Sequence, residues 1–235
     1  MSEGPVAVAA RNNAEWCDLV CRSHGLPGAF GAGFWVNRGH GLPYYPDLVT
    51  LSPRTDAEDV AAALGAPAAG TGVKDSFATL DLGPAGYEPL FEATWIHRPA
   101  GPPGRSPGGG LSWEEVTSPE ELDAWRSASG DEAAGVLLPG LLETPGCGVV
   151  AGRASGRVVA GAMVNLSAGA AGVSNVFCGE RDPDEVWGGV LDAAARIAPG
   201  LPVVGYERDD ALRAAIRNGC RPIGALRVWV FPADG

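Results

Sequence analysis

The sequence predicts an α/β (α+β) protein, built on a mixed, mostly antiparallel twisted sheet that is flanked by helices. Hydrophobic residues make up 46% and charged residues 19% of the 235 residues, which is typical of a globular protein. Helical segments with capping residues alternate with short apolar segments bounded by Gly and Pro. A Pro- and Gly-rich stretch then divides the chain into an N-terminal α/β domain at 1–98, a linker at 99–110 and a second domain at 111–235.

The N-terminal half predicts two helices and several strands. Asn12, with Glu15 three positions later, has the pattern of a capping box, and Gly25 is placed to end the helix. Thr55 and Glu58 predict a second capped helix that runs to Leu64. Extended segments are expected near 33–37 and 47–52, and strands within 74–98.

The C-terminal half has clearer signals for where its helices and strands begin and end. Ser118, Pro119 and Glu121 predict a helix start. Short Gly-containing turns then separate three extended segments, which we expect to form an antiparallel meander because such turns join only antiparallel neighbours. The remaining pattern predicts a helix, a strand, a helix and a last strand. The extended segments are 148–154, 157–166 and 173–178, and the later elements are 182–197, 201–206, 209–218 and 222–231.

Charge and cysteine content limit the class of protein. A net charge of −11 and a pI of about 4.7 argue against sequence-independent binding to a phosphate backbone. The five cysteines are an odd number, and no secretory leader precedes them, so we expect free thiols and a cytoplasmic location. The sequence contains no run of about 20 apolar residues, and we expect no membrane-spanning segment.

The order helix, meander, helix, strand, helix, strand resembles the GNAT superfamily of N-acyltransferases. The ending from Asn218-Gly219-Cys220 to Val230 is similar to the closing passage of that family. The resemblance covers residues 111–230. The N-terminal half fits either a second, degenerate copy of the fold or an added layer that shapes the substrate site.

The resemblance implies that segments 173–178 and 201–207 begin together and splay apart, with acyl-CoA between them. Val176, Cys178 and Arg181 would then contact the donor. The family's Gly-rich turn at the following helix start normally holds the pyrophosphate. Here that turn lacks the paired glycines and carries four carboxylates, namely Glu180, Asp182, Asp184 and Glu185.

One carboxylate about 4 Å from a phosphate costs about 1 kcal/mol in bulk water and several at a protein surface. We therefore expect the pyrophosphate to be repelled. No tightly bound cofactor is expected, and acyl-CoA is a doubtful cosubstrate. Some members of the wider fold use aminoacyl-tRNA instead, and this donor stays open, although the acidic net charge weighs against it.

The resemblance also implies a general base on the first splayed strand and a Tyr acid in the later helix. Asn175 lies on that strand, while Ala215 stands at the Tyr position and Cys220 at the position of the closing Phe. Tyr206 and Glu207 end the second splayed strand. We interpret Glu207, Asn175 and Tyr206 as candidate catalytic residues; the alternative is that Glu207 only charges the start of the next helix.

Six residues are candidates for substrate binding: Trp35, Asn37, His40, Tyr44, Asn165 and Asp209. The first four form a polar and aromatic cluster that fits an acceptor pocket or ordinary core packing equally well. Asn165 could orient a substrate amide or be a satisfied polar residue in a strand. Cys17, Cys21 and His24 share one helical stripe, but a structural zinc site needs a fourth ligand, so we expect buried thiols and no metal.

The sequence therefore predicts an N-acyltransferase that moves an acyl group to a small amine. Two alternatives stay open: a transferase of the same fold that uses aminoacyl-tRNA or another non-CoA donor, and a non-catalytic GNAT-like binding module.

Overall fold

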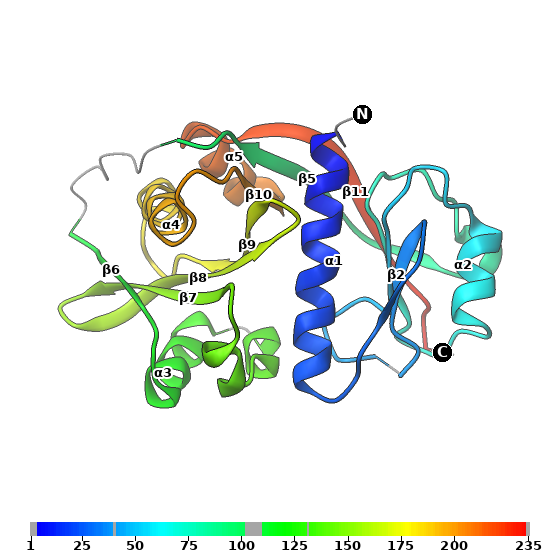
Figure 1. The fold of residues 1–235 in the computed structure, drawn as a ribbon, viewed down its shortest axis with the longest axis horizontal. Coiled ribbons are helices and arrows are strands. Elements are labelled where there is room, and N and C mark those ends of the chain that lie inside the picture. Colours follow the sequence, from blue (N-terminus) through cyan, green and yellow to red (C-terminus); the bar gives the residue numbers. More distant parts are fainter. Residues whose placement is uncertain (1–3, 40, 102–109, 131, 234–235) are drawn as a thin grey trace. The chain divides into compact units, whose positions relative to one another are not determined.

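The computed structural model describes residues 4–39, 41–101, 110–130 and 132–233, shown as a ribbon in Figure 1. These residues form five α-helices and eleven strands, and most strand pairs are antiparallel. The predicted fold class is therefore confirmed. The chain divides into two compact units: unit 1 is Met1–Trp95 with Ile223–Gly235, and unit 2 is Ile96–Pro222. The predicted linker falls mostly on residues 102–109, which lie outside the described residues.

Unit 1 is built from a short meander followed by a crossover helix. Its elements are α1 (Pro5–Ser23), β1 (Ala29–Phe30), β2 (Phe34–Val36), β3 (Leu48–Thr50), α2 (Ala57–Leu64), β4 (Gly72–Asp75), a 3₁₀ turn at Gly83–Ala85, and most of β5 (Glu88–Arg98) and β11 (Arg221–Val230). β1, β2 and β3 pair antiparallel, and β3 and β4 pair parallel across α2. β11 closes this part of the sheet by pairing antiparallel with β4.

Both helices predicted in this half are present, but each begins at a different residue from the one predicted. α1 begins at Pro5, and Asn12 lies buried in its middle. The Ala-rich segment before Asn12 favours helix, and Pro5 fits the first helical position, so no cap is needed at Asn12. The cap of α2 is Asp56 with Asp59, one residue after the predicted pair, because the Thr55 hydroxyl instead donates to the Gly33 carbonyl at 2.8 Å. Gly25 follows α1 with φ 75°, as predicted.

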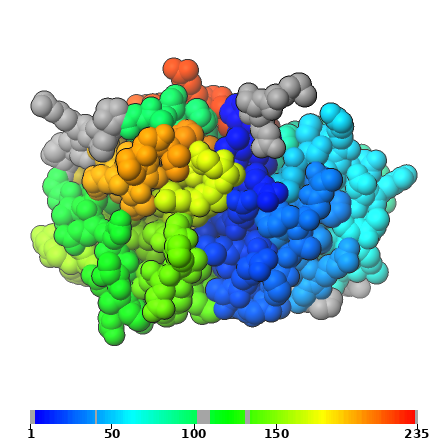
Figure 2. Space-filling view, viewed as in Figure 1, coloured from blue at the N-terminus to red at the C-terminus, as the bar shows by residue number. Residues whose placement is uncertain are grey.

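The core of unit 1 packs α2 against the sheet. Val60 and Ala63 on α2 are buried with Val36, Leu48 and Val73 from the strands. The residues of α2 on the opposite face are exposed to solvent, and Figure 2 shows cyan atoms of this part of unit 1 at the surface. α2 is thus an amphipathic crossover helix that covers one face of its strands.

Unit 2 repeats this arrangement with longer elements. They are β6 (Ser112–Glu115), α3 (Pro119–Ser129), two 3₁₀ turns (Glu132–Val136 and Pro139–Glu143), β7 (Cys147–Ala154), β8 (Arg157–Ser167), β9 (Ala170–Phe177), α4 (Pro183–Ile197), β10 (Val203–Glu207) and α5 (Asp209–Arg217). Strands β6 to β9 pair antiparallel in chain order. β10 pairs parallel with β9 across α4, which confirms the predicted parallel neighbours. Ser118 caps α3 as predicted, by accepting from Glu121 N.

Each unit therefore contains the same order of meander, crossover helix and parallel strand. In unit 1 the carboxyl ends of the parallel pair are tied together, because Ser76 N donates to Thr50 Oγ1 at 2.8 Å. Asp75, fully buried beside them, accepts from Leu80 N at 2.8 Å. The two units therefore share one topology, and in unit 1 the ends of the parallel strands are joined by this hydrogen bond.

Candidate active site

The candidate active site lies where β9 and β10 of unit 2 leave their common register. The two strands pair at Val203 with Ala171 and at Val204 with Gly172. They are still close at Gly205, because a Cβ there would lie 2.7 Å from the Val173 carbonyl oxygen. Beyond that point the side chains of both strands change from buried to partly exposed. Ligand sites in open α/β sheets form beyond such carboxyl ends.

A β-bulge shapes the β9 side of this site. Met163 of β8 pairs with Ser174 and Gly161 with Phe177, so Asn175 and Val176 together oppose a single residue of β8. Asn175 adopts φ 51°, a left-handed conformation that Asn tolerates better than most residues. A bulge takes backbone groups out of the ladder, which leaves them able to contact a ligand.

Ser174, the residue before the bulge, was not singled out from the sequence. Its hydroxyl oxygen is buried and has no hydrogen-bond partner among the described residues. Nothing in the sequence separates this Ser from other strand hydroxyls, because its significance depends on the register shift beside it.

Glu207, at the end of β10, is the residue on this side of the site whose pKa is most relevant to catalysis. It is partly buried, and loss of solvent raises its pKa to about 7, although the charge and backbone N–H of Arg208 lower it. Burial raises the pKa of Cys178 to about 11 and that of Cys220 to about 12, and the charge of Glu207 adds to both shifts. The ends of β9 and β10 and the segment after α5 therefore bring these three groups together.

Arg98 is a second residue that the sequence analysis missed. Its charge lowers the pKa of Cys220, and its Nε would lie 3.9 Å from a Cβ at Gly219. Arg98 ends β5, more than a hundred residues before Cys220 in the chain, so only the fold reveals this proximity.

The charged groups at the start of α4 form hydrogen bonds and an ion pair with one another. Asp182 caps the helix by accepting from Asp184 N at 3.0 Å. Arg181, predicted to contact the donor, is bound by Glu185 through two nitrogens, with Nη2 2.7 Å and Nε 3.2 Å from Oε2. One backbone donor and one guanidinium that a pyrophosphate would need are thus already engaged.

The remaining candidates of unit 2 are Asn165, Asp209 and Tyr206. Asn165 pairs in register with Gly172, three residues before Asn175, and its Nδ2 donates to Ser167 Oγ at 3.2 Å. Asp209 is the first residue of α5, with φ 52° and an exposed carboxylate 3.9 Å from Arg208 Nε. Tyr206 is partly buried next to Glu207.

The N-terminal candidates belong to unit 1. Trp35 is fully buried, and its Nε1 donates to Asp18 Oδ1 at 3.0 Å. Asn37 is buried and donates from Nδ2 to the Leu26 carbonyl at 3.0 Å, so both side chains make structural hydrogen bonds. Tyr44 is 62% exposed and adopts φ 70°. His40 lies outside the described residues.

The thiols of α1 are structural neighbours in unit 1. Cys17 and Cys21 are buried, and burial raises the pKa of each thiol, that of Cys21 to about 11. Within the described residues, no group of three or more His, Cys, Asp or Glu side chains could hold a metal ion. No described helix combines the length and the apolar character needed to cross a membrane.

Neither a protein-family model nor a curated protein matches this sequence. Solved structures do match it. A GCN5-related N-acetyltransferase from Kribbella flavida superimposes with a TM-score of 0.67 at 17% identity, over 99% of this chain and 98% of that chain. The chain has the GNAT fold.

Two further structures with the GNAT fold agree over most of the chain. A putative GNAT-family acetyltransferase from Novosphingobium aromaticivorans has a TM-score of 0.54 at 17% identity, over 94% of this chain and 96% of that chain. A GCN5-related N-acetyltransferase-like protein from Streptococcus suis has a TM-score of 0.56 at 11% identity, again over 94% and 96%. The GNAT likeness predicted for residues 111–230 therefore extends to nearly the whole chain.

Proposed function

We propose that this chain is an N-acyltransferase that moves an acyl group from a thioester to the amino group of a small acceptor. The observation that carries the proposal is Glu207, a carboxylate with a pKa of about 7 at the carboxyl end of a parallel strand pair in a GNAT fold. A general base is most effective when its pKa lies near the working pH.

Glu207 would take the proton that the acceptor must lose. An amine enters mostly as the ammonium ion, which a carboxylate attracts. Transfer of one proton to Glu207 yields the neutral amine, whose lone pair attacks the acyl carbonyl carbon. The C–N bond forms, the attacking nitrogen loses its second proton to solvent, and the C–S bond breaks. The products are an amide and a thiolate, and the proton on Glu207 is also released to solvent.

The bulge at Asn175 and Val176 would stabilise the oxyanion. Negative charge develops on the carbonyl oxygen during attack, and a fixed backbone N–H aimed at that oxygen lowers the barrier. The departure of this segment from the β8 ladder supports its use for such a contact. The Ser174 hydroxyl beside it is a second candidate donor.

The leaving thiolate would depart without a protein acid. Ala215, at the position of the family's Tyr, is fully buried and carries no proton to give. Cys178 and Cys220 have pKa values of about 11 and about 12, well above the roughly 8.5 of an ordinary thiol, so they donate poorly to such a thiolate. A low-pKa thiolate is a sufficient leaving group on its own.

A second candidate is a transferase whose donor lacks a pyrophosphate group. The engagement of Arg181 by Glu185 and of Asp184 N by Asp182 favours this donor class, because neither group is available to a phosphate. Aminoacyl-tRNA is one such donor, although the net charge of −11 opposes a polynucleotide. A binding module without turnover is the remaining alternative.

The test measures thiol release from acetyl-CoA and from S-acetyl-pantetheine, which has no phosphate, in the presence of small primary amines. We expect turnover with at least one donor, and a loss of about a hundredfold or more at neutral pH in Glu207→Gln. Glu143→Gln, at an exposed site, is the matched control and should keep full turnover. Full activity in Glu207→Gln would overturn the assignment of the base. Binding of thioester or amine without any turnover would support the binding module.

A further inference from the structure

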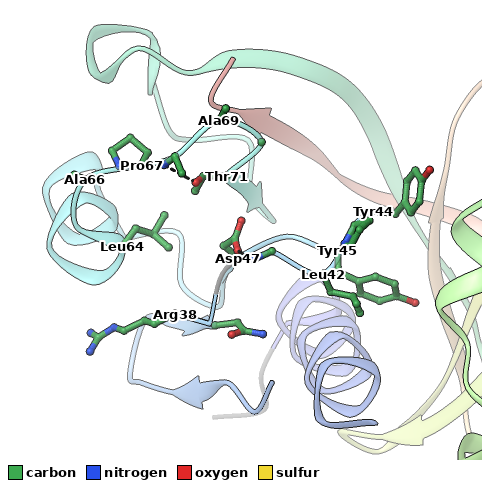
Figure 3. Close-up of a pocket in the computed structure, with 15 residues that line it drawn as sticks. Arg38, Leu42, Tyr44, Tyr45, Asp47, Leu64, Ala66, Pro67, Ala69 and Thr71 are labelled. Carbon is green, nitrogen blue, oxygen red and sulfur yellow. Dashed lines mark hydrogen bonds between the residues drawn. The ribbon is translucent and has the colours of Figure 1, made fainter. Parts of the chain in front are cut away.

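We propose that unit 1 carries a separate binding site for a small primary ammonium ligand, centred on Asp47. The site is a pocket of about 350 Å³ lined by residues 37, 38, 41–45 and 47 and by residues 64 and 66–71, between α2 and β4 (Figure 3). This volume is at the lower end of the range for small-molecule sites. All of its described lining residues belong to unit 1, whereas Glu207 belongs to unit 2.

Asp47 supplies a buried negative charge at this pocket. It is only 7% exposed, and its carboxylate is held by backbone donors, Gly41 N at 3.1 Å and Gly72 N at 2.8 Å. None of the ion pairs formed by the described residues includes Asp47. Buried charges in proteins are normally paired, so a carboxylate beside a cavity without a cationic partner favours a cationic ligand.

The negative charge of Asp47 also acts on Tyr87. The pKa of Tyr87 is raised first by burial and then by the negative charge of Asp47.

The end of α2 also lines the pocket, and its negative partial charge is offset by Arg38, which donates to a carbonyl of its last turn. The carboxyl end of a helix carries about half a negative charge, and the last turn of α2 has no basic residue. Leu64 of that turn and Ala66 just after it line the pocket. Arg38 also lines it, but its Nε donates to the Ala63 carbonyl at 3.0 Å, and Figure 3 shows its guanidinium pointing away from Asp47.

The lining also has an apolar part that suits a short alkyl chain. Leu42, Leu64 and Pro67 contribute to the wall, and Figure 3 shows Leu64 and Pro67 on the α2 side of Asp47. A negative floor with an apolar wall fits an alkylammonium ion better than a carboxylate or a phosphate. The ligand class is therefore a small primary amine with an apolar chain.

The test compares hexylammonium, hexanol and hexanoate by isothermal titration of the full chain. We expect hexylammonium to bind at least about tenfold more tightly than hexanol, a difference of about 1.4 kcal/mol, and hexanoate to bind more weakly still. Equal binding of hexylammonium and hexanoate, or no binding of hexylammonium, would overturn the proposal.

Three variants locate the binding. Ala66→Lys places a cation in the exposed pocket wall and should weaken hexylammonium binding about fivefold or more, a loss of about 1 kcal/mol. Ala62→Lys makes the same charge change on the exposed face of α2, outside the lining residues, and should change binding less than about twofold. Each titration is also made in the Glu207→Gln background, which removes the carboxylate proposed to attract the acceptor amine, and binding at Asp47 should persist there. Equal effects of the two lysine variants, or loss of binding in Glu207→Gln, would contradict a site at Asp47.

Discussion

Arg217 in the last turn of α5 donates from Nε to both carboxylate oxygens of Asp184 in the first turn of α4, at 2.9 and 2.7 Å. Asn218 Nδ2 adds a bond of 3.1 Å to the backbone oxygen of Asp184. Together with the Arg181–Glu185 pair, this contact neutralises two of the four carboxylates that the sequence places at the start of α4. Pyrophosphate binding is therefore opposed less by uncompensated negative charge than by the existing hydrogen bonds of Arg181, Arg217 and the Asp184 backbone N–H.

The first prediction concerns acetyl-CoA. Replacing Asp182→Asn, Asp184→Asn and Glu185→Gln together should release Arg181 and Arg217, while Asn at the cap position keeps α4 capped. We expect the triple variant to gain a larger melting shift with acetyl-CoA than the unmodified protein does. A ligand at a hundredfold its Kd stabilises by about 2.7 kcal/mol, which thermal unfolding detects easily.

Strong stabilisation of the unmodified protein by sub-millimolar acetyl-CoA would contradict the first prediction. The pyrophosphate would then bind somewhere other than the start of α4. The control is dephospho-CoA, which keeps the pyrophosphate but lacks the ribose 3′-phosphate. It should respond to the triple variant as acetyl-CoA does.

The second prediction is the pH dependence of stability that Glu207 imposes. Its pKa rises from 4.5 to about 7 on folding, so the folded state binds more protons than the unfolded state between these values. Stability from this group is therefore present below pH 4.5 and is lost as pH rises through about 7. Glu207→Gln should be more stable than the unmodified protein at pH 8, on the order of 1–3 kcal/mol, and the gain should vanish near pH 4.

Urea unfolding of both proteins at the two pH values measures this difference. A constant difference between the proteins across the range would show that the Glu207 carboxyl titrates normally in the folded chain, and the case for it as a base would fail with it. The exposed-site variant Glu143→Gln, measured in the same way, is the control for the Glu-to-Gln substitution itself.

The third prediction concerns the packing behind the bulge. Gly161 pairs with Phe177, and a methyl group on it would overlap the Trp125 indole and approach Phe177 Cε1 to 2.7 Å. Gly161→Ala should therefore destabilise unit 2 by about 1–3 kcal/mol, the usual cost of overpacking a core. Gly140→Ala, where nothing lies within 4 Å, is the control and should change the urea midpoint little. Equal midpoints for the two variants would show that this region relaxes freely.

Local patterns predicted the elements of unit 2 well because capping side chains mark where its helices begin. Ser118 caps α3 and Asp182 caps α4, each by a side-chain oxygen that can be recognised from sequence. The α1 start was misplaced because Asn12 also satisfies the capping pattern, while the true start at Pro5 carries no side-chain cap. The local signs of the longer helix were the Ala-rich segment before Asn12 and Pro5 at the first helical position.

The candidate site was predicted only in part for a different reason. Glu207 could be found because it ends a strand whose parallel partner is implied by the crossover helix. The bulge at Asn175, the Arg217–Asp184 pair and the proximity of Arg98 to Cys220 depend on register and on contacts across many residues. Such relationships exist only in three dimensions, and a single sequence does not encode them in any local pattern.

The last prediction separates the backbone of the bulge from the Asn175 side chain. At φ 51° a Gly is unstrained, whereas a β-branched residue is strongly disfavoured. If the bulge acts through its backbone, Asn175→Gly should keep turnover within about threefold, because it removes the amide group but allows the same conformation. Asn175→Val should lose about 1–2 kcal/mol in stability and at least about tenfold in turnover, because it opposes the left-handed conformation. Turnover with S-acetyl-pantetheine and urea unfolding of both variants provide the two measurements. Equal and large losses of turnover in both variants, with Asn175→Gly as stable as the unmodified protein, would instead assign the contribution to the amide side chain and remove the backbone from the proposed mechanism.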